Sequence, residues 1–380
     1  METQQGFLAE EVGVAPEIVG EALRKATTKL LNEVRKVREA ISEIRRAIES
    51  RRDLFLIRRA GTPRDLCYAA IDSGFTAPAI ELVGGYLGIV LVTEVLYGSR
   101  CGGGGIDVRA YVDLWFNDDL TNSIARYYER LTTLRLLERK RAGEADFDVL
   151  LIDGEIIPRT RWVSGGERSG RQELLGKVVD LTGEVLKVAN ETDTAIVGVL
   201  KRSYSRDIIN ILGFSNLKLS DKAVISLVLE EGEYLIAGDH FTIRAELEKL
   251  TGMPGVRRDW LRSRLEWYES LVNSIPVGYT VKLAFYRAPR TIYPTATKVE
   301  YVTSDTIDEE TLLSNLVHIS SGTGIPAPVD YADSFSNISR ELKQTVYNKL
   351  LAELAKSVGS KEIVPLLSLI NPEKLRHIIG

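Results

Sequence analysis

The first sixty residues have the hydrophobic spacing of one long helix. Between Pro16 and about Arg59, apolar side chains recur alternately four and three positions apart, which is the repeat of a coiled-coil stripe. The stripe consists of Leu30, Val34, Val37, Ile41, Ile44 and Ile48. It spans only about three heptads, so two arrangements stay open: packing of the helix on its own domain, and a seam between two subunits. Gly61-Thr62-Pro63 ends the helix, and residues 1–60 are predicted to form an N-terminal helical, coiled-coil segment.

The pattern then changes to apolar runs typical of β-strands. Three such runs cover residues 66–75, 85–96 and 106–116, and an amphipathic helix follows from 118 to about 142. The continuous apolar run DFDVLLIDGEI predicts a further strand, buried on both faces. The order strand, strand, strand, helix, strand is that of a ribonuclease H-like fold. We therefore predict an α/β protein with a ribonuclease H-like mixed sheet as its core.

The rest of the chain alternates between strands and helices. TAIVGVLKRS predicts another buried strand, and residues 222–303 are predicted to be β-rich with a helical insert near 257–273. Within that region, KLAFYRAP and TKVEYVTSD alternate as half-buried strands do. Helices are expected at about 309–319, 333–358 and 361–378. This predicts a core domain over 61–338, with its β-rich insert, and a C-terminal helical segment over 339–380.

Two of the predicted strands end in an aspartate that is followed closely by glycine. Asp72 ends the first strand in AIDSGF, and Asp153 ends the fourth in LLIDGEI. Alone, an Asp-Ser-Gly of this kind is typical of a solvated strand end followed by a turn. In a ribonuclease H-like sheet, however, the first and fourth strands are neighbours, so both carboxylates leave the same edge within reach of one ion. The two acids together predict a metal site.

A third acidic ligand is expected from the helix between these strands. Glu129 is our choice because its apolar neighbours face inward, and Glu138 stays open as the alternative, although it lies among basic residues on a solvated end. A cluster of carboxylate oxygens suits Mn²⁺ or Mg²⁺, and two ions would relieve the mutual repulsion of the acids. Asp72 is the expected bridging ligand between them.

Cysteine and histidine contribute little to this picture. Cys67 and Cys101 give neither a disulfide framework nor a CxxC pair, and the three scattered histidines disfavour a zinc site. Any metal is therefore expected to be held by oxygen. Few Cys, Met and His beside many Glu, Arg and Lys favour a thermophilic source.

Charge and hydropathy limit the class of protein. The formal net charge of −4 in 380 residues argues against nonspecific coating of nucleic acid but permits local basic patches. No apolar run approaches the roughly twenty residues of a membrane span, and METQQGFLAEEV has neither the basic start nor the apolar core of a signal peptide. A cytoplasmic location is the resulting expectation.

A basic, glycine-rich loop over 156–171 follows the second acid. Its Gly165-x4-Gly170 spacing resembles a Walker A motif, but Arg171-Gln172 stands where Lys and Ser/Thr are required, so we predict no ATP binding. A basic loop beside an acidic site is typical of a guide for a polyanion, and its tryptophan can stack on a base. The DNA-binding residues predicted here are Arg159, Arg161, Trp162, Arg168 and Arg171.

The strand after this loop ends in a second group of cations. Lys201 and Arg202 close the strand, and Arg206 follows. A lysine that points into an acidic site orients a phosphate or stabilises developing charge. We predict a catalytic role for Lys201 and contacts to DNA for all three.

These residues together resemble the NurA nucleases, which process DNA ends beside the hexameric ATPase HerA. Four stretches carry the likeness: AIDSGF with Asp72, LLIDGEI with Asp153, IVGVLKRS with Lys201, and GIPAPVDYADSFSNI with Asp333. The resemblance implies a ring-shaped dimer that threads DNA, and manganese-dependent 5′ to 3′ exonuclease and single-strand endonuclease activity in end resection for recombinational repair. It also implies that Asp72, Glu129 and Asp153 bind metal and that Asp333 completes the site.

Three positions depart from the pattern of that family. Glu155 follows the second acid where serine is frequent, Ile325 stands where tyrosine is common, and some members have histidine in place of Asp333. The tyrosine's role is thus either dispensable or supplied by a neighbour such as Tyr331.

An alternative function from another class of protein is a noncatalytic clamp that holds DNA or regulates a motor ATPase. Such a clamp would be expected to have lost an acid. An actin-like phosphotransferase would carry paired glycine-rich phosphate loops, and no convincing pair is present.

Overall fold

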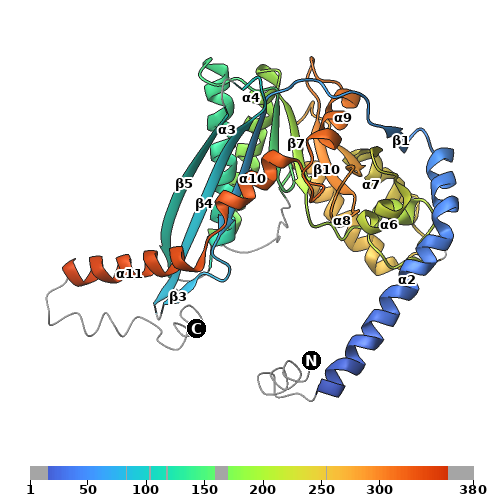
Figure 1. Ribbon diagram of the computed structural model, residues 1–380, viewed down its shortest axis with the longest axis horizontal. Helices are drawn as coiled ribbons and strands as arrows, with labels where there is room; N and C mark the ends of the chain where they lie inside the picture. The colour runs from blue at the N-terminus through green and yellow to red at the C-terminus, as the bar shows by residue number, and fades with distance from the viewer. Residues whose placement is uncertain are drawn as a thin grey trace.

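The protein is described here from a computed structural model, which covers residues 16–82, 84–101, 104–116, 119–158, 170–253 and 255–357. Within these ranges the strands form one ten-stranded sheet in the order β1-β8-β9-β10-β7-β6-β2-β4-β3, with β5 paired to β4. Helices cover both faces of the sheet (Figure 1). Among the described residues, no helix is long and apolar enough to cross a membrane.

The predicted core order is confirmed. β2 pairs in parallel with β6 and antiparallel with β4, and β4 pairs antiparallel with β5. The first and fourth strands of the core are therefore neighbours, as a ribonuclease H-like sheet requires. The elements of this core are β2 (Tyr68–Phe75), β4 (Gly85–Tyr97), β5 (Gly105–Trp115), α3 (Thr121–Arg141) and β6 (Val149–Asp153). The short β3 (Ile80–Leu82) pairs with the start of β4.

A helix that the sequence analysis did not foresee connects the core to the next strand. α4 (Gly170–Glu191) packs beside α3 and leads into β7 (Ala195–Leu200), which pairs in parallel with β6. Its buried residues include Val178, Thr182 and Val185, at the spacing of one helical face. A basic loop had been predicted through Arg171, which instead lies in the first turn of α4. The predicted loop residues 159–169 lie outside the described part of the chain.

The N-terminal helix is shorter than predicted. α2 (Pro16–Ser50) ends nine residues before Arg59 because β1 (Leu56–Arg59) turns back to pair with β8. The C-terminal part of the apolar stripe, with Val37 and Ile44, is buried in the protein's own core, whereas Leu30 is 58% exposed. Figure 1 shows the N-terminal half of α2 (blue) extending away from the body. The stripe thus packs on its own domain at one end only.

The middle of the chain contains more helix than predicted. Two short helices with side-chain N-caps, Ser220 and Asp239, flank a strand, and both are absent from the β-rich prediction. Helices over the sheet also bury both faces of the strands that were predicted to be half-buried. The elements are α5 (Asp207–Ile211), α6 (Asp221–Val228), β8 (Glu233–Asp239), α7 (His240–Glu248), α8 (Arg258–Asn273), β9 (Lys282–Tyr286) and β10 (Thr297–Val302).

The C-terminal helices divide differently from the prediction. α9 (Glu309–Ile319) has the predicted bounds, but the helix predicted over 333–358 is two helices, α10 (Ala327–Ser336) and α11 (Arg340–Ser357). The break follows from Asn337, whose extended backbone ends α10. Asp333 therefore lies inside a helix that crosses β2 and β4. The helix predicted over 361–378 lies outside the described residues.

The two cysteines are joined in a disulfide, contrary to the expectation from the sequence. Cys67 precedes β2 and Cys101 follows β4, with Cα atoms 5.1 Å apart across 34 positions of the chain. The β2–β4 register, which places Tyr68 opposite Tyr97, brings the two cysteines together. Spacing along the sequence does not reveal this proximity.

Candidate metal centre

Three aspartates from three separate elements meet at one point. Asp72 in β2, Asp153 at the end of β6 and Asp333 in α10 each offer a carboxylate oxygen, and these oxygens lie within 4.8 Å of one another. The parallel register that pairs Ile71 with Ile152 places the next residues of both strands side by side. Because successive strand residues face opposite sides of a sheet, both aspartates point toward α10.

Helix α10 closes the centre from above the sheet. The Ser336 hydroxyl donates a hydrogen bond to Asp72 Oδ2, and Asp333 lies one turn earlier on the same helix. Asp72 is buried, Asp153 is partly buried and Asp333 is exposed. The three acids therefore form a cluster with a closed floor and an open, solvent-facing side.

Lys201 is the cation of this cluster. It directly follows β7, and its Nζ lies 2.8 Å from Asp153 Oδ2 and 3.1 Å from Asp333 Oδ2. Burial opposes the charged form, but the two carboxylates outweigh it and raise the pKa of Lys201 above its usual value. The lysine stays protonated and offsets part of the negative charge.

The acids are difficult to ionise without a cation. Burial, with the Asp72 charge adding to it, raises the pKa of Asp153 to about 7, while Lys201 acts in the opposite direction. Burial also raises the pKa of Asp72; the Ser336 hydroxyl opposes this effect and the Asp333 charge adds to it. Desolvated carboxylates that repel one another gain most when a divalent ion binds. Their oxygens are ligands that suit Mg²⁺ or Mn²⁺.

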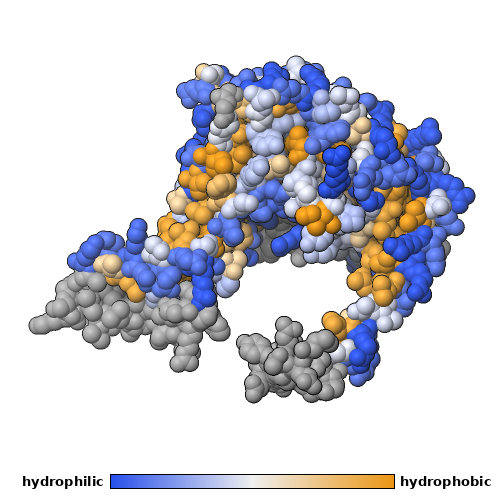
Figure 2. Space-filling model, in the orientation of Figure 1, coloured by the Kyte–Doolittle hydropathy of each residue, from blue (hydrophilic) through white to orange (hydrophobic). Residues whose placement is uncertain are grey.

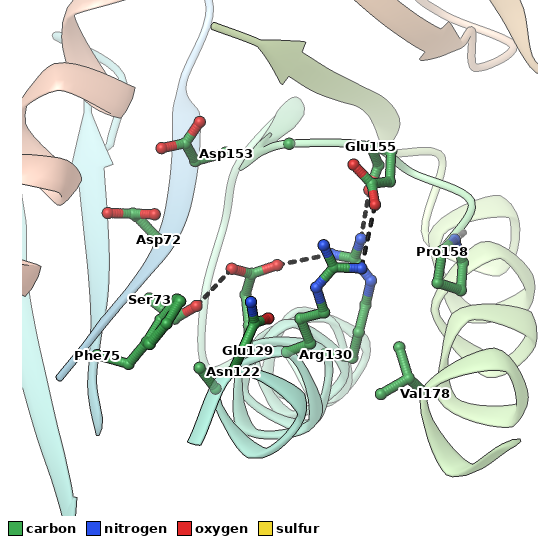
Figure 3. Close-up of a pocket in the computed structure, with 13 residues that line it drawn as sticks. Asp72, Ser73, Phe75, Asn122, Glu129, Arg130, Asp153, Glu155, Pro158 and Val178 are labelled. Atoms are coloured by element: carbon green, nitrogen blue, oxygen red, sulfur yellow. Dashed lines mark hydrogen bonds and ion pairs between the residues drawn. The ribbon is translucent and has the colours of Figure 1, made fainter. Parts of the chain in front are cut away.

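Glu129 lines the same cavity from the opposite face of the sheet. Its Oε2 accepts a hydrogen bond from Ser73 Oγ at 2.7 Å, and its Oε1 accepts one from Arg130 Nη1 at 3.1 Å. Burial raises the pKa of Glu129 to about 7; Arg130 opposes this shift, and the charges of Asp72 and Asp153 add to it. Figure 3 shows Glu129 directed toward the same space as these two aspartates. It lies outside the three-aspartate cluster itself.

The alternative helix acid lies elsewhere. The side chain of Glu138 is 48% exposed, with Oε1 4.0 Å from Arg141 Nη2 at the far end of α3. The structure therefore brings Glu129, and not Glu138, to the cavity. Its role as a metal ligand stays a prediction.

Two arginines in the cavity were not predicted. Arg126 Nη1 lies 3.2 Å from Glu155 Oε1, and Arg130 Nη2 donates to the carbonyl oxygens of Glu155 and Ile156. Figure 3 shows Arg130 between Glu129 and Glu155. Both arginines line a cavity of about 330 Å³ together with Asp72, Glu129 and Asp153. Arg126, Glu129 and Arg130 occupy positions i, i+3 and i+4 of α3, a spacing that places them on one helix face and was visible in the sequence.

The predicted DNA-binding residues have different environments. Arg202 is exposed, whereas Arg206 Nη2 donates to the carbonyls of Ser215 and Leu217. Arg171 is exposed in α4. The remaining four lie outside the described residues: Arg159, Arg161, Trp162 and Arg168. Contacts of all these side chains with DNA stay predictions.

Ile325, which stands where the family commonly has tyrosine, is followed six residues later by the exposed Tyr331. Ile325 packs against the core beneath α9 and α10, and Tyr331 on α10 is 48% exposed, with its ring 5.9 Å from that of Tyr97. The structure places a phenol near this end of α10, although not at position 325.

The chain is similar to known proteins in sequence and in fold. A family model described as the NurA domain matches residues 68–338. The crystal structure of the NurA nuclease from Sulfolobus solfataricus has a TM-score of 0.56 and 12% identity, over 89% of this chain and 98% of that one. A crystal structure of NurA with manganese has a TM-score of 0.51 and 14% identity, over 90% and 99%. At these identities the likeness to solved structures concerns the fold. A comparison with curated proteins finds no match.

Proposed function

The chain belongs to the NurA family, and we propose that it is a Mn²⁺- or Mg²⁺-dependent DNA nuclease. The observation that carries the proposal is the convergence of Asp72, Asp153 and Asp333 within 4.8 Å beside Lys201. A manganese-containing NurA structure of the same fold adds support. A noncatalytic clamp has no need for such a cluster, in which burial raises the pKa of Asp72 and of Asp153 and thus disfavours their ionised state.

The roles of the residues follow from their positions. Asp72, Asp153 and Asp333 would hold one or two divalent ions, with Asp72 between them and Glu129 completing the set. Such ions supply Lewis-acid activation of water and stabilise the leaving oxygen in phosphodiester hydrolysis. Lys201 places a positive charge at the open side, where it can orient the phosphate.

The positioning of Glu129 depends on the residues around it. Ser73 and Arg130 fix both of its carboxylate oxygens. With a pKa of about 7, this side chain can hold a proton at neutral pH and release it when the local charge becomes more positive. Arg130, which is itself 5% exposed, keeps Glu129 oriented toward the aspartates.

The finer activity that we propose is the one that the family resemblance implies. It comprises 5′ to 3′ exonuclease activity on single- and double-stranded DNA, and endonuclease activity on single strands. We further propose that the protein acts in end resection with a hexameric HerA-like ATPase, and that it works as a homodimer.

An apolar face of β5 supports the homodimer. Alternate residues of this edge strand are exposed and apolar: Ile106, Val108, Val112 and Leu114. They face away from α3, because Tyr111 on the opposite side stacks on Tyr128 of that helix at 3.6 Å. Figure 2 shows apolar surface where Figure 1 places β4 and β5. Single exposed apolar residues are ordinary, but a row along one strand favours a partner surface.

The decisive test is a nuclease time course on end-labelled single- and double-stranded DNA with Mn²⁺, Mg²⁺ or EDTA. Asp72→Ala and Asp153→Ala should each lower nuclease activity by more than about a hundredfold. This exceeds the loss of about 10- to 100-fold that is usual when a residue behind the metal ligands is removed. The double variant should be scarcely worse than either single one, since residues that act as a unit are not additive. Asp333→Ala should be milder, and Asp333→His should keep partial activity.

Glu138→Gln is the matched control, because it removes an exposed acid from the same helix as Glu129 and should leave cleavage unchanged. Without metal, the melting temperatures of the aspartate variants should stay level or rise, since the change removes mutual repulsion. The stabilisation on adding Mn²⁺ should shrink. Full activity in Asp72→Ala would refute the proposed site.

A further inference from the structure

A second cavity lies next to the metal centre but shares no lining residue with it. It has a volume of about 250 Å³, and its lining includes Leu200 and Arg202, the two neighbours of Lys201. Leu200 is opposite Lys298 in the β7–β10 register. Glu300 lines the second cavity and accepts a hydrogen bond from the backbone N–H of Ile156 at 2.8 Å. Ile156 lies three residues after Asp153, so this bond links the second cavity to the metal centre. The two cavities thus lie on either side of the segment that carries the catalytic lysine.

A buried ammonium group lines this second cavity. Lys298 is 7% exposed, and its Nζ lies 3.3 Å from Ser205 Oγ. The carboxylate of Asp207 is engaged in a two-point ion pair with Arg264 and accepts a hydrogen bond from Tyr268. The carboxylate of Glu300 accepts the backbone N–H of Ile156 and lies 3.3 Å from His240 Nε2. An ammonium has three donors, so Lys298 has capacity for an anionic ligand.

The carboxylate of Asp221 is likewise committed elsewhere. It accepts the backbone N–H groups of Asp207 at 2.9 Å and Ile209 at 3.0 Å. Burial lowers the pKa of Lys298; the charges of Asp207, Asp221 and Glu300 oppose this effect, and the charge of Arg264 adds to it. Within the described ranges Lys298 bonds to the Ser205 hydroxyl and makes no direct ion pair, so an anion in the cavity would give this buried cation a charged partner.

Further polar and aromatic groups line the cavity. His240 is 2% exposed, and its Nδ1 makes no hydrogen bond within the described part of the chain. Arg264 stacks on the ring of Trp267 at 3.7 Å, and Trp260 forms more of the aromatic wall. Tyr204, on the same stretch as the exposed Arg202, is 85% exposed. Cations beside aromatic rings are the combination that binds single-stranded nucleotides.

We propose that this cavity binds a nucleotide of the DNA strand through its phosphate. Lys298 and Arg202 contact the phosphate, and Tyr204 stacks on the base. The volume is a little below the roughly 300–1,000 Å³ of sites for drug-sized ligands, which suits a phosphate and sugar with the base at the opening. The identity of the strand rests on the proposed nuclease function, whereas the phosphate-binding chemistry follows from the cavity alone.

The test measures binding of 5′-dAMP to the full chain by calorimetry in EDTA. EDTA removes the divalent ions through which a phosphate would bind at the aspartate cluster. We expect 5′-dAMP to bind and deoxyadenosine to bind at least about tenfold more weakly, since a hydrogen-bonded charge contributes that much. Inorganic phosphate in excess should displace the nucleotide. A separate arm with 3′-dAMP shows which end of a strand the cavity prefers, and selective binding of either monophosphate supports the proposal.

Lys298→Met keeps the length of the side chain and removes the charge, and it should lower the affinity for 5′-dAMP at least tenfold. Arg262→Ala is the matched control, because it removes a cation from α8 at an exposed position that does not line the cavity. It should leave binding unchanged. If circular dichroism shows that Lys298→Met does not fold, Arg202→Ala and Tyr204→Ala decide the question, since both side chains are exposed.

Two results would overturn the proposal: no binding of 5′-dAMP at millimolar concentration, or equal affinities in the parent and in all folded cavity variants. Asp153→Asn separates this proposal from the nuclease proposal. It should abolish cleavage while leaving 5′-dAMP binding in EDTA intact. Binding without any metal-dependent cleavage by the parent protein would contradict only the nuclease function.

Discussion

Asp153 shows at the scale of one residue how burial sets chemistry. Its pKa is raised to about 7 by burial and by the Asp72 charge, whereas an aspartate in an unfolded chain has a pKa of about 3.9. The folded protein therefore holds a proton at this site over a pH range in which the unfolded chain does not. Without metal, the stabilisation from this proton is present below about pH 4 and is lost as the pH rises to about 7.

We therefore expect the melting temperature in EDTA to fall between pH 5 and 8, by a few degrees more in the parent than in Asp153→Asn. Stabilisation by Mn²⁺ should grow over the same range, because the ion competes with protons for the carboxylates. Thermal melts at several pH values, with and without Mn²⁺, measure both effects. Glu138→Gln should keep the parent's slope. Equal slopes in the parent and Asp153→Asn would mean that this carboxyl is already ionised in the folded, metal-free protein.

At the scale of elements, the metal centre depends on how closely α10 approaches β2. Gly74 permits this approach: a Cβ built at this position would lie 1.8 Å from the Ser336 carbonyl oxygen. Any larger side chain must push α10 away from the sheet. Asp333 and Ser336 would move with it, away from Asp72.

Gly74→Ala should therefore lower the free energy of unfolding by about 3 kcal/mol, the upper part of the range for overpacking, and should remove most nuclease activity. Gly176→Ala is the control, since a Cβ at that position in α4 meets nothing within 4 Å. It should raise stability by about 0.5–1 kcal/mol. Urea unfolding and cleavage assays on both variants test this pair. Parent-like stability in Gly74→Ala would show that α10 does not pack so closely.

The disulfide acts on the same group of elements. It closes a loop across 34 positions that contains β2, β3 and β4. Loop-closure entropy predicts a contribution of roughly 3–4 kcal/mol for a loop of this length. Cys101→Ser should lower the free energy of unfolding by this amount, and a reducing agent should lower that of the parent equally. Reductant should have no further effect on Cys101→Ser. An unchanged parent under reductant, with both thiols shown to be free, would contradict the prediction.

At the scale of the whole molecule, two groups of exposed apolar residues on the described surface bear on assembly. One is the β5 row, and the other is the N-terminal half of α2, where Leu23, Leu30 and Leu31 are all more than half exposed. Helix α11 already packs on its own chain, since Tyr347 of this helix is buried against residues of β3 and β4. The described surface thus offers separate positions for a second copy of the chain and for a motor partner.

We assign the β5 row to the homodimer and expect Val112→Lys to convert the dimer to a monomer, because a charge in an apolar interface is left unpaired. Light scattering at micromolar concentration measures the mass. Leu30→Lys should keep the dimer and weaken binding to a HerA-like ATPase, while Lys349→Ala on exposed α11 should change neither. A monomeric parent would refute the dimer, and dissociation by Leu30→Lys instead of Val112→Lys would move its interface to α2.

The sequence by itself determined the order of the core strands and the place of two acids. Apolar runs identify β2 and β6, and parallel pairing of these strands makes the positions of Asp72 and Asp153 adjacent. Glu129 is buried and Glu138 is exposed as predicted, although the neighbours on which that choice rested, Tyr128, Leu131 and Leu134, are only partly buried. These features depend on periodicity within single elements, which is local. Asp333 was identified through the resemblance to a family, and no local pattern indicates it.

Tertiary structure alone decided the contacts between distant segments. Ser336 bonds to Asp72 across 264 positions of the chain, and the register of β2 with β4 brings Cys67 to Cys101. The second cavity likewise combines the turn after β7 with α8 and β10. Such contacts depend on how helices pack across the sheet and on where a chain reverses. Packing and chain reversal are set by the sum of many weak interactions rather than by any one stretch of residues.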